Sequence, residues 1–196
     1  MARPVKFRTE TLLDQATDLF WRQGYEATSV QDLVNELNLH PGSLYHTFGD
    51  KHALFMAVLD RYAATVGCRI TDLLRGSGSG RGAIEQVFQT SVDLLSAREG
   101  RRGCLMTNTA MECADHDPEA ARKIAAYQQT TEDALTDALN LARTNGEIRS
   151  QTPEEIRALA RFLNGCLQGM RVLAHSGPDA RVRLEVMAQM ALRALD

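Results

Sequence analysis

Apolar residues recur every three or four positions through most of the chain, a spacing typical of amphipathic helices. No segment has the strict alternation of a half-buried strand, so the pattern predicts an all-α fold of about nine helices. The first helix is expected over about Thr9–Gln23, and the fourth is a long helix that begins after Asp50. The first helix should bury one stripe, formed by Leu12, Ala16, Leu19 and Phe20. Later helices are expected over 83–99, 104–114, 118–145, 152–175 and through 182–190, with the glycine-rich stretch 76–82 as a loop.

Residues 28–51, TSVQDLVNELNLHPGSLYHTFGDK, predict two short helices joined by a tight turn. Thr28 and Gln31 have the spacing of a capping box, which satisfies backbone N–H groups at a helix start. Asn38 suits the left-handed residue that ends a helix, and Pro41 suits the first turn of the next one. Helices this short depend on their neighbours for stability. The segment therefore predicts a helix–turn–helix whose second helix enters the major groove of DNA.

Three linked segments make the assignment more specific. They read Gly-Tyr-x-x-Thr-Ser, Gly-Ser-Leu-Tyr-x-x-Phe and Gly-x-Lys-x-x-Leu, and all lie within residues 11–59. In order and spacing, this third of the chain resembles the TetR family of transcriptional regulators. The resemblance implies an all-helical homodimer, most often a repressor, that releases a palindromic operator when a small-molecule inducer binds. It implies a helix–turn–helix DNA-binding domain at 1–50, a ligand-binding and dimerisation domain at 51–196, and no cofactor.

The resemblance also indicates which residues meet DNA. Tyr45, Thr28 and Lys51 match positions that grip the phosphate backbone, although Tyr45 could instead be buried and Thr28 could only cap a helix. Base contacts are expected from the start of the third helix, where His40-Pro41 replaces the family's usual small polar and basic pair, so the operator sequence is not predicted. The full set of expected DNA contacts is Thr28, Ser29, Gln31, His40, Pro41, Gly42, Ser43, Tyr45, His46 and Lys51.

The charge balance does not by itself indicate a DNA-binding protein. The formal net charge is −3, and residues 1–62 carry six Lys and Arg against eight Asp and Glu. Positive charge must therefore be local, from Arg3, Lys6 and Arg8 in the N-terminal arm and from Lys51. Helix N-termini can add N–H donors for phosphates, so weak non-specific DNA binding is expected.

The chain has the features of a cytoplasmic protein that does not bind membranes. No apolar run approaches the roughly 20 residues that span a bilayer, and the N-terminus lacks the apolar core of a secretory signal. The four cysteines are widely spaced within helical patterns, which predicts reduced thiols and no disulfide framework.

Cys104 is the candidate sensor. It follows Arg101 and Arg102 at a predicted helix start, and both features stabilise a thiolate. The Gly-Cys-Leu-x-x-Asn run resembles a subset of the family in which such a cysteine senses electrophiles or oxidants; the alternative is a packing residue. A thiol enzyme that uses Cys104 as nucleophile lacks a convincing base, and residues 112–117 lack a second ligand pair for zinc, so neither an enzyme nor a metal site is expected.

A ligand pocket is expected among the helices of residues 54–175, with a weak preference for a largely apolar or uncharged inducer. Besides Cys104, the candidate lining residues are Phe88, Met106, Met111, Tyr127 and Phe162. The last two helices are expected to form a four-helix dimer interface, in which two glycines allow close approach of the second subunit. The expected interface consists of Leu159, Phe162, Gly165, Cys166, Gly169, Met170, Leu173, Val186 and Met190. Activation in place of repression, and a protein-binding adaptor, are the remaining alternatives.

Overall fold

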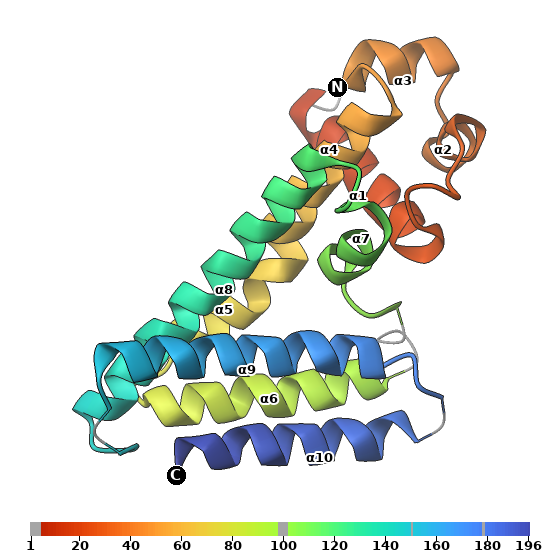
Figure 1. The fold of residues 1–196 in the computed structure, drawn as a ribbon. Coiled ribbons are helices and arrows are strands. Elements are labelled where there is room, and N and C mark those ends of the chain that lie inside the picture. Colours follow the sequence, from red (N-terminus) through yellow and green to blue (C-terminus); the bar gives the residue numbers. More distant parts are fainter. Residues whose placement is uncertain (1–4, 98–101, 150, 178) are drawn as a thin grey trace. The chain divides into compact units, whose positions relative to one another are not determined.

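The structure, a computed structural model, describes residues 5–97, 102–149, 151–177 and 179–196, and every regular element in these ranges is helical (Figure 1). The helices are α1 (Val5–Gln23), α2 (Val30–Leu37), α3 (Pro41–Phe48), α4 (Lys51–Tyr62), α5 (Cys68–Arg75), α6 (Gly80–Ser96), α7 (Leu105–Cys113), α8 (Pro118–Thr144), α9 (Pro153–Leu173) and α10 (Ala180–Leu192). A π-helical turn, Ala63–Gly67, joins α4 to α5, and a 3-10 turn, Arg193–Leu195, follows α10. With α4 and α5 taken as one long helix, the described ranges contain the nine helices that the sequence predicts.

The helices form two compact units. Unit 1 comprises residues 1–66 and 104–124, and unit 2 comprises residues 67–103 and 125–196. Unit 1 therefore holds α1 to α4, α7 and the start of α8, because α4 and α7 pack with the helix–turn–helix. The assignment of DNA binding to 1–50 and of ligand binding and dimerisation to 51–196 concerns activity, and it stays a prediction.

The core of unit 1 lies between α1 and α4. All four residues of the predicted α1 stripe are buried. The Phe20 and Phe55 rings lie 4.9 Å apart, and Tyr25 stacks on Phe55 at 4.5 Å between centroids. Burial of such aromatic rings contributes strongly to the stability of a core. This core is the support that the two short helices α2 and α3 require.

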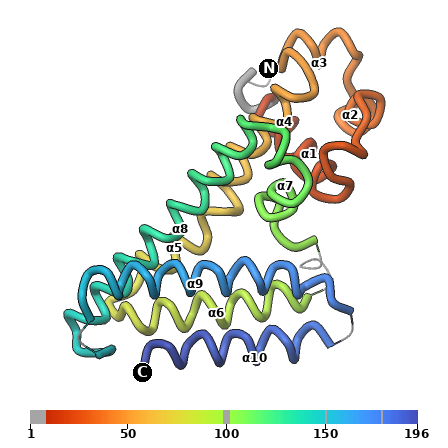
Figure 2. The backbone as a smooth tube through the Cα atoms, viewed as in Figure 1, coloured from red at the N-terminus to blue at the C-terminus, as the bar shows by residue number. Residues whose placement is uncertain are grey.

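In unit 2, α6, α9 and α10 run side by side (Figure 2). Their shared core, with α8, includes Ile84, Val87, Phe88, Leu135, Leu139, Ile156, Leu163, Met170 and Leu184. Helix α6 begins at Gly80, with the Ser79 hydroxyl accepting from Gly82 N at 2.9 Å. The prediction of a loop over 76–82 was therefore wrong for its last three residues, because Ser79 caps a helix that already contains the two following glycines.

The predicted helix ends are mostly confirmed. Asn38 adopts the left-handed conformation at φ 48°, the Asp50 carboxylate accepts from Ala53 N, and Asp117 caps α8. Thr152 and Glu155 form the expected capping box at α9.

The capping box at α2 is shifted by one residue from the prediction. Ser29 is the N-cap, and its partner is Asp32, so the assignment to Thr28 and Gln31 was wrong. Thr28 is fully buried, and its hydroxyl donates to the Gly24 carbonyl at 2.6 Å. The Gln31 amide instead donates to Asn35 at 3.0 Å along the same helix.

No helix in the described ranges is both long enough and apolar enough to cross a bilayer.

Candidate nucleic-acid interface

Helix α3 presents nearly all of its surface to solvent at one end of unit 1 (Figure 1). Leu44 is its one fully buried side chain, and this residue anchors the helix to the core. Tyr45 is 47% exposed, which rules out the alternative of an aromatic buried between helices. No side chain of a described residue caps the start of α3 at His40. Pro41 has no N–H, and Ser43 N and Leu44 N donate to the His40 carbonyl, which leaves the Gly42 N–H to meet a phosphate. An exposed helix held at a fixed angle by one anchor can enter a groove.

The structure places most of the expected DNA contacts on the surface. The exposed members are Ser29 and Gln31 from α2 and its cap, and His40, Pro41, Gly42, Ser43, Tyr45 and His46 from α3 and its cap. The expectation for Thr28 was wrong, because its side chain is buried and its hydroxyl is bonded within unit 1. Lys51 is half-buried, and its ammonium lies 4.2 Å from the centroid of the Tyr25 ring at the start of α4. Arg3 and Arg101, and the side chains of Lys6 and Arg8, lie outside the described residues.

The hydroxyl of Ser29 is already used at the start of α2. It donates to Asp32 Oδ2 at 2.6 Å and accepts from Asp32 N at 3.1 Å. Hydrogen bonds from the Ser29 hydroxyl and then from the Ser29 backbone N–H lower the pKa of Asp32. This surface therefore carries a persistent negative charge close to the reading helix, and the DNA contacts have to come mainly from α3.

The candidate sensor Cys104 is the N-cap residue of α7 in unit 1. Its side chain is only 3% exposed, and the Tyr62 hydroxyl donates to Sγ at 3.4 Å. Cys113, at the other end of α7, is also buried. Desolvation by burial, followed by the charges of Glu112, Glu26 and Asp117, raises the pKa of the Cys113 thiol to about 11. Cys113 is therefore a poor sensor at neutral pH, and sensing by Cys104 stays a prediction.

Two of the expected ligand-lining residues lie on the surface instead. Met111 is 82% exposed and Phe162 is 51% exposed, so these two expectations were wrong. Both alternate with buried neighbours on amphipathic helices, and the sequence did not distinguish the two faces. Phe88, Met106 and Tyr127 are buried, which leaves their role in ligand binding a prediction.

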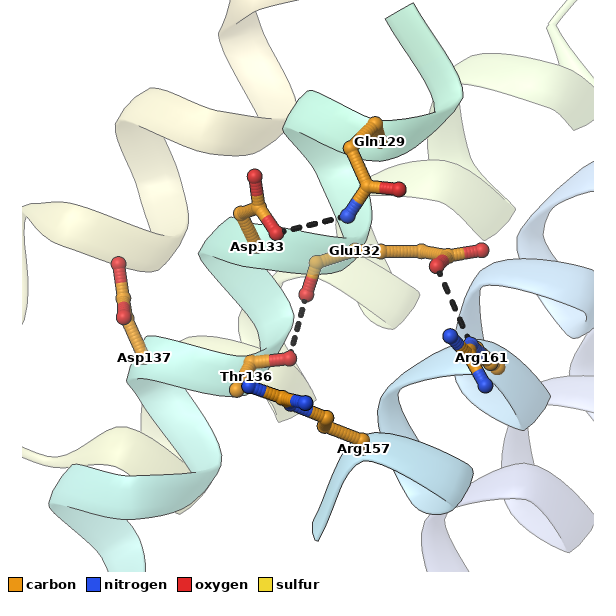
Figure 3. Close-up of a pocket in the computed structure, with 7 residues that line it drawn as sticks. All are labelled: Gln129, Glu132, Asp133, Thr136, Asp137, Arg157 and Arg161. Atoms are coloured by element: carbon orange, nitrogen blue, oxygen red, sulfur yellow. Dashed lines mark hydrogen bonds and ion pairs between the residues drawn. The ribbon is translucent and has the colours of Figure 1, made fainter. Parts of the chain in front are cut away.

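A polar hollow of about 300 Å³ lies between α8 and α9 in unit 2 (Figure 3). The Gln129 amide donates to Asp133 at 2.8 Å, and Arg161 pairs with Glu132 at 3.6 Å. The hollow is lined by Gln129, Glu132, Asp133, Thr136, Asp137, Arg157 and Arg161. Its charged lining does not suit the largely apolar or uncharged inducer that the sequence favoured.

A chain of polar side chains is buried beside this hollow, and sequence reasoning missed it. The Asn164 and Gln168 amides both donate to Gln128 Oε1, and Arg171 donates to Gln168 Oε1 and to the Tyr127 hydroxyl. Asn164 and Arg171 are buried in the unit 2 interior. The signal was the spacing of positions 164, 168 and 171, which places three polar residues on one face of α9.

The expected dimer residues divide into two groups. Cys166 and Met170 belong to the core of unit 2, and Leu159 and Leu173 pack partly against it, so the first two were wrongly assigned to an interface. Gly169 faces α10 of the same chain, since a Cβ there would lie 2.7 Å from Met187 Cε. By contrast, a Cβ at Gly165 would meet nothing within 4 Å. The exposed apolar residues of α9 and α10, which we call the apolar face, are Phe162, Val172, Val182, Val186 and Met190.

In the described part of the chain, no three His, Cys, Asp or Glu side chains are arranged to hold a metal ion. Within residues 112–117, Asp117 caps α8 and Glu112 accepts two backbone N–H groups.

Comparison with known proteins identifies the family. The model described as "Bacterial regulatory proteins, tetR family" matches residues 12–58, and the model described as "Tetracyclin repressor-like, C-terminal domain" matches residues 80–188. The chain belongs to the TetR family. It is a helix–turn–helix transcriptional regulator, and the hypothesis of a thiol enzyme is abandoned.

Similar TetR-family proteins align along almost the whole chain. The HTH-type transcriptional regulator YezE of Bacillus subtilis is 34% identical over 100% of both chains. The HTH-type transcriptional repressor ComR of Escherichia coli is 31% identical over 96% of this chain and 88% of its own. A cysteine-substituted form of the TetR-family regulator CifR, solved with 26-base-pair double-stranded operator DNA, is 28% identical with a TM-score of 0.83, covering 95% of this chain and 96% of its own.

Proposed function

We propose that this protein is a homodimeric repressor that binds a palindromic operator in cytoplasmic DNA through α3. The observation that carries the proposal is the exposure of α3 around its single buried anchor, Leu44. A similar protein is named a repressor, and another was solved with operator DNA. The exposed side chains of α3 can reach base edges, and the Tyr45 hydroxyl and Lys51 can reach phosphates.

Dimerisation would supply the second reading helix. The apolar face of α9 and α10 has five large hydrophobic side chains that are exposed, and a concentration of exposed apolar side chains on two packed helices favours an interaction site. The open space beside Gly165 allows another helix to approach closely. A two-fold dimer through this face would place two α3 helices on symmetric half-sites, which accounts for a palindromic operator.

Release from the operator would follow from binding of an inducer that prefers the DNA-incompetent conformation. The proposed route is a shift of α4, which carries Lys51 at its start and is followed by the π-helical turn. A small molecule held by buried groups of unit 2, or modification of Cys104, would supply the trigger. Differential alkylation tests the second trigger: Cys104 must react faster at neutral pH than an unfolded thiol, or it is not the sensor.

Removal of one hydroxyl tests the reading surface. An operator is first selected from random double-stranded DNA with the purified wild-type protein, and affinity is then measured by fluorescence anisotropy. Tyr45→Phe is expected to weaken binding about five- to tenfold, because one hydrogen bond to phosphate is lost. Its thermal midpoint should stay unchanged, since the side chain is largely exposed.

Thr144→Val is the matched control, because it removes an exposed hydroxyl from α8 in unit 2. The proposal fails if the wild-type protein selects no palindromic sequence, or if Tyr45→Phe binds as tightly as Thr144→Val. Activation is the second candidate, since both activities use the same reading helix. A reporter gene placed behind the selected operator distinguishes them by whether expression rises or falls when the regulator is deleted.

A further inference from the structure

We propose that Glu112 of α7 is a positioning residue for DNA binding: it holds the turn before α2 and thereby fixes the helix–turn–helix for the operator. The proposal rests on the function proposed above. In this proposal Glu112 does not contact DNA itself but acts through the backbone of unit 1.

The contact is a carboxylate that bridges two successive backbone amides. Glu112 Oε2 accepts from Tyr25 N at 3.0 Å, and Oε1 accepts from Glu26 N at 2.8 Å. The two hydrogen bonds span 87 and 86 positions of sequence. Bonds from N–H groups to an ionised carboxylate are stronger than neutral ones, and two in parallel also fix direction. The side chain therefore fastens α7 to the turn that connects α1 to α2.

Gly24 is shaped to admit this carboxylate. Its backbone lies at φ +84°, in the left-handed region that favours glycine. A Cβ at this position would lie 2.8 Å from Glu112 Oε1 and 3.0 Å from Oε2, closer than ordinary contact permits. The conformation of the turn favours glycine, and a side chain at this position would displace the Glu112 carboxylate from the two amides.

The turn leads directly into the reading helices. The Thr28 hydroxyl donates to the Gly24 carbonyl at 2.6 Å, and Thr28 N donates to the Tyr25 carbonyl at 3.3 Å. The next residue, Ser29, is the N-cap of α2, which a short turn connects to α3. The direction in which α2 leaves the turn therefore sets the direction of α3. Without Glu112, the Tyr25 and Glu26 amides would lose the acceptor that holds this turn against α7.

The other end of α7 carries Cys104, whose Sγ accepts the hydrogen bond from the Tyr62 hydroxyl. Glu112 lies eight positions after Cys104 along this helix, so a segment of about 12 Å joins the buried thiol to the carboxylate. A displacement of α7 would therefore pull directly on the turn before α2.

The experiment compares Glu112→Ala and Glu112→Gln with Asp115→Asn in the full-length protein. Asp115 lies three positions away on the exposed surface, and its side chain makes no hydrogen bond or ion pair with another described residue, so Asp115→Asn controls for the loss of one negative charge. Alanine removes both acceptors, whereas glutamine keeps one oxygen and should behave as an intermediate. Three quantities are measured: exchange of the Tyr25 and Glu26 amides by NMR, operator affinity, and its dependence on salt.

In Glu112→Ala we expect the two amides to exchange about tenfold faster and the operator to bind about tenfold more weakly. In Glu112→Gln the loss of affinity should be about threefold, as expected for a partial rescue. The slope of affinity against salt should equal that of the wild-type protein, because no phosphate contact is removed. If Glu112 only stabilised the fold, its substitution would leave operator affinity unchanged at temperatures well below the thermal unfolding midpoint.

The proposal is overturned if either variant exchanges these amides and binds the operator as Asp115→Asn does. If Glu112→Ala does not fold, Glu112→Gln alone still tests the proposal. Failure of the wild-type protein to bind any operator would overturn the proposed function as well, whereas wild-type binding with unaltered Glu112 variants would overturn the positioning role alone.

Discussion

Cys113 shows how its surroundings set the chemistry of a thiol. Burial and three neighbouring carboxylates raise its pKa to about 11, so the protonated form prevails at neutral pH. We expect iodoacetamide to label Cys113 at pH 7.5 at least tenfold more slowly than after unfolding. Labelling followed by peptide mass spectrometry measures this ratio, and equal rates in the folded and unfolded chains would contradict the raised pKa.

The same shift has a consequence for stability. The folded chain disfavours ionisation of this thiol, whereas the unfolded chain does not. The stability conferred by the protonated thiol is therefore complete below the ordinary thiol pKa, and it is lost as the pH rises toward about 11. Cys113→Ala should flatten the fall of the unfolding free energy over this alkaline range.

Single residues also mark the limit of sequence reasoning at α2. The chain offers two neighbouring hydroxyls, Thr28 and Ser29, and either has plausible capping spacing. Only the structure distinguishes their roles. The Thr28 hydroxyl donates to the Gly24 carbonyl, and Ser29 is the N-cap of α2. The sequence did not reveal Glu112 as a partner of this turn, because the two residues that it contacts lie 87 and 86 positions earlier in the chain.

At the scale of elements, Gly80 sets how closely α6 approaches α8. A Cβ at this position would overlap the Ala138 carbonyl oxygen and lie 2.5 Å from Ala142 N, and backbone atoms cannot move aside as a side chain can. Gly80→Ala is therefore expected to lower the free energy of unfolding by about 3 kcal/mol. Chemical denaturation at a fixed protein concentration measures the change.

Gly78→Ala is the control for this substitution, because nothing lies within 4 Å of a Cβ there. The two glycines are two positions apart, yet one is open and the other is enclosed. A similar stability for both variants would refute the close contact between the helices.

The elements themselves were largely predictable from local chemistry. Asp50, Asp117 and Thr152 begin helices as expected, because capping depends on hydrogen bonds to residues two or three positions along the chain. The start of α6 was not predictable, because glycine is a poor helix former. Gly80 lies within a helix because it packs closely against α8.

For the whole molecule, the apolar face is the decisive surface. Phe162→Glu would place a charge at the centre of a proposed helix-to-helix interface, and we expect the dimer dissociation constant to rise about 100-fold or more. Operator affinity should fall in parallel, because one reading helix per molecule is lost. Sedimentation velocity over a dilution series measures the association.

Met111→Glu provides the comparison. Met111 is even more exposed than Phe162, but it lies on α7 in unit 1, so the same substitution there should leave the dimer intact. Dissociation by both substitutions, or by neither, would argue against an interface at this face.

The sequence predicted that α9 carries apolar residues for two purposes, but it could not divide them. Periodicity reveals that a helix has an apolar stripe, without indicating what covers it. Cys166 and Met170 turn toward the core of their own unit, and Phe162 turns toward solvent. Gly169 likewise accommodates Met187 of the same chain, while Gly165 faces open space.

The π-helical turn Ala63–Gly67 has a practical consequence for protein engineering. The division between the units, after Val66, falls inside this turn, where hydrogen bonds enclose one residue more than in an α-helix. A segment with this altered register tolerates a change of chain length better than an unbroken helix whose every residue is packed. The chain crosses between the units twice more, after residues 103 and 124, so chimeras that graft a foreign sensor onto this reading unit would be spliced at all three places.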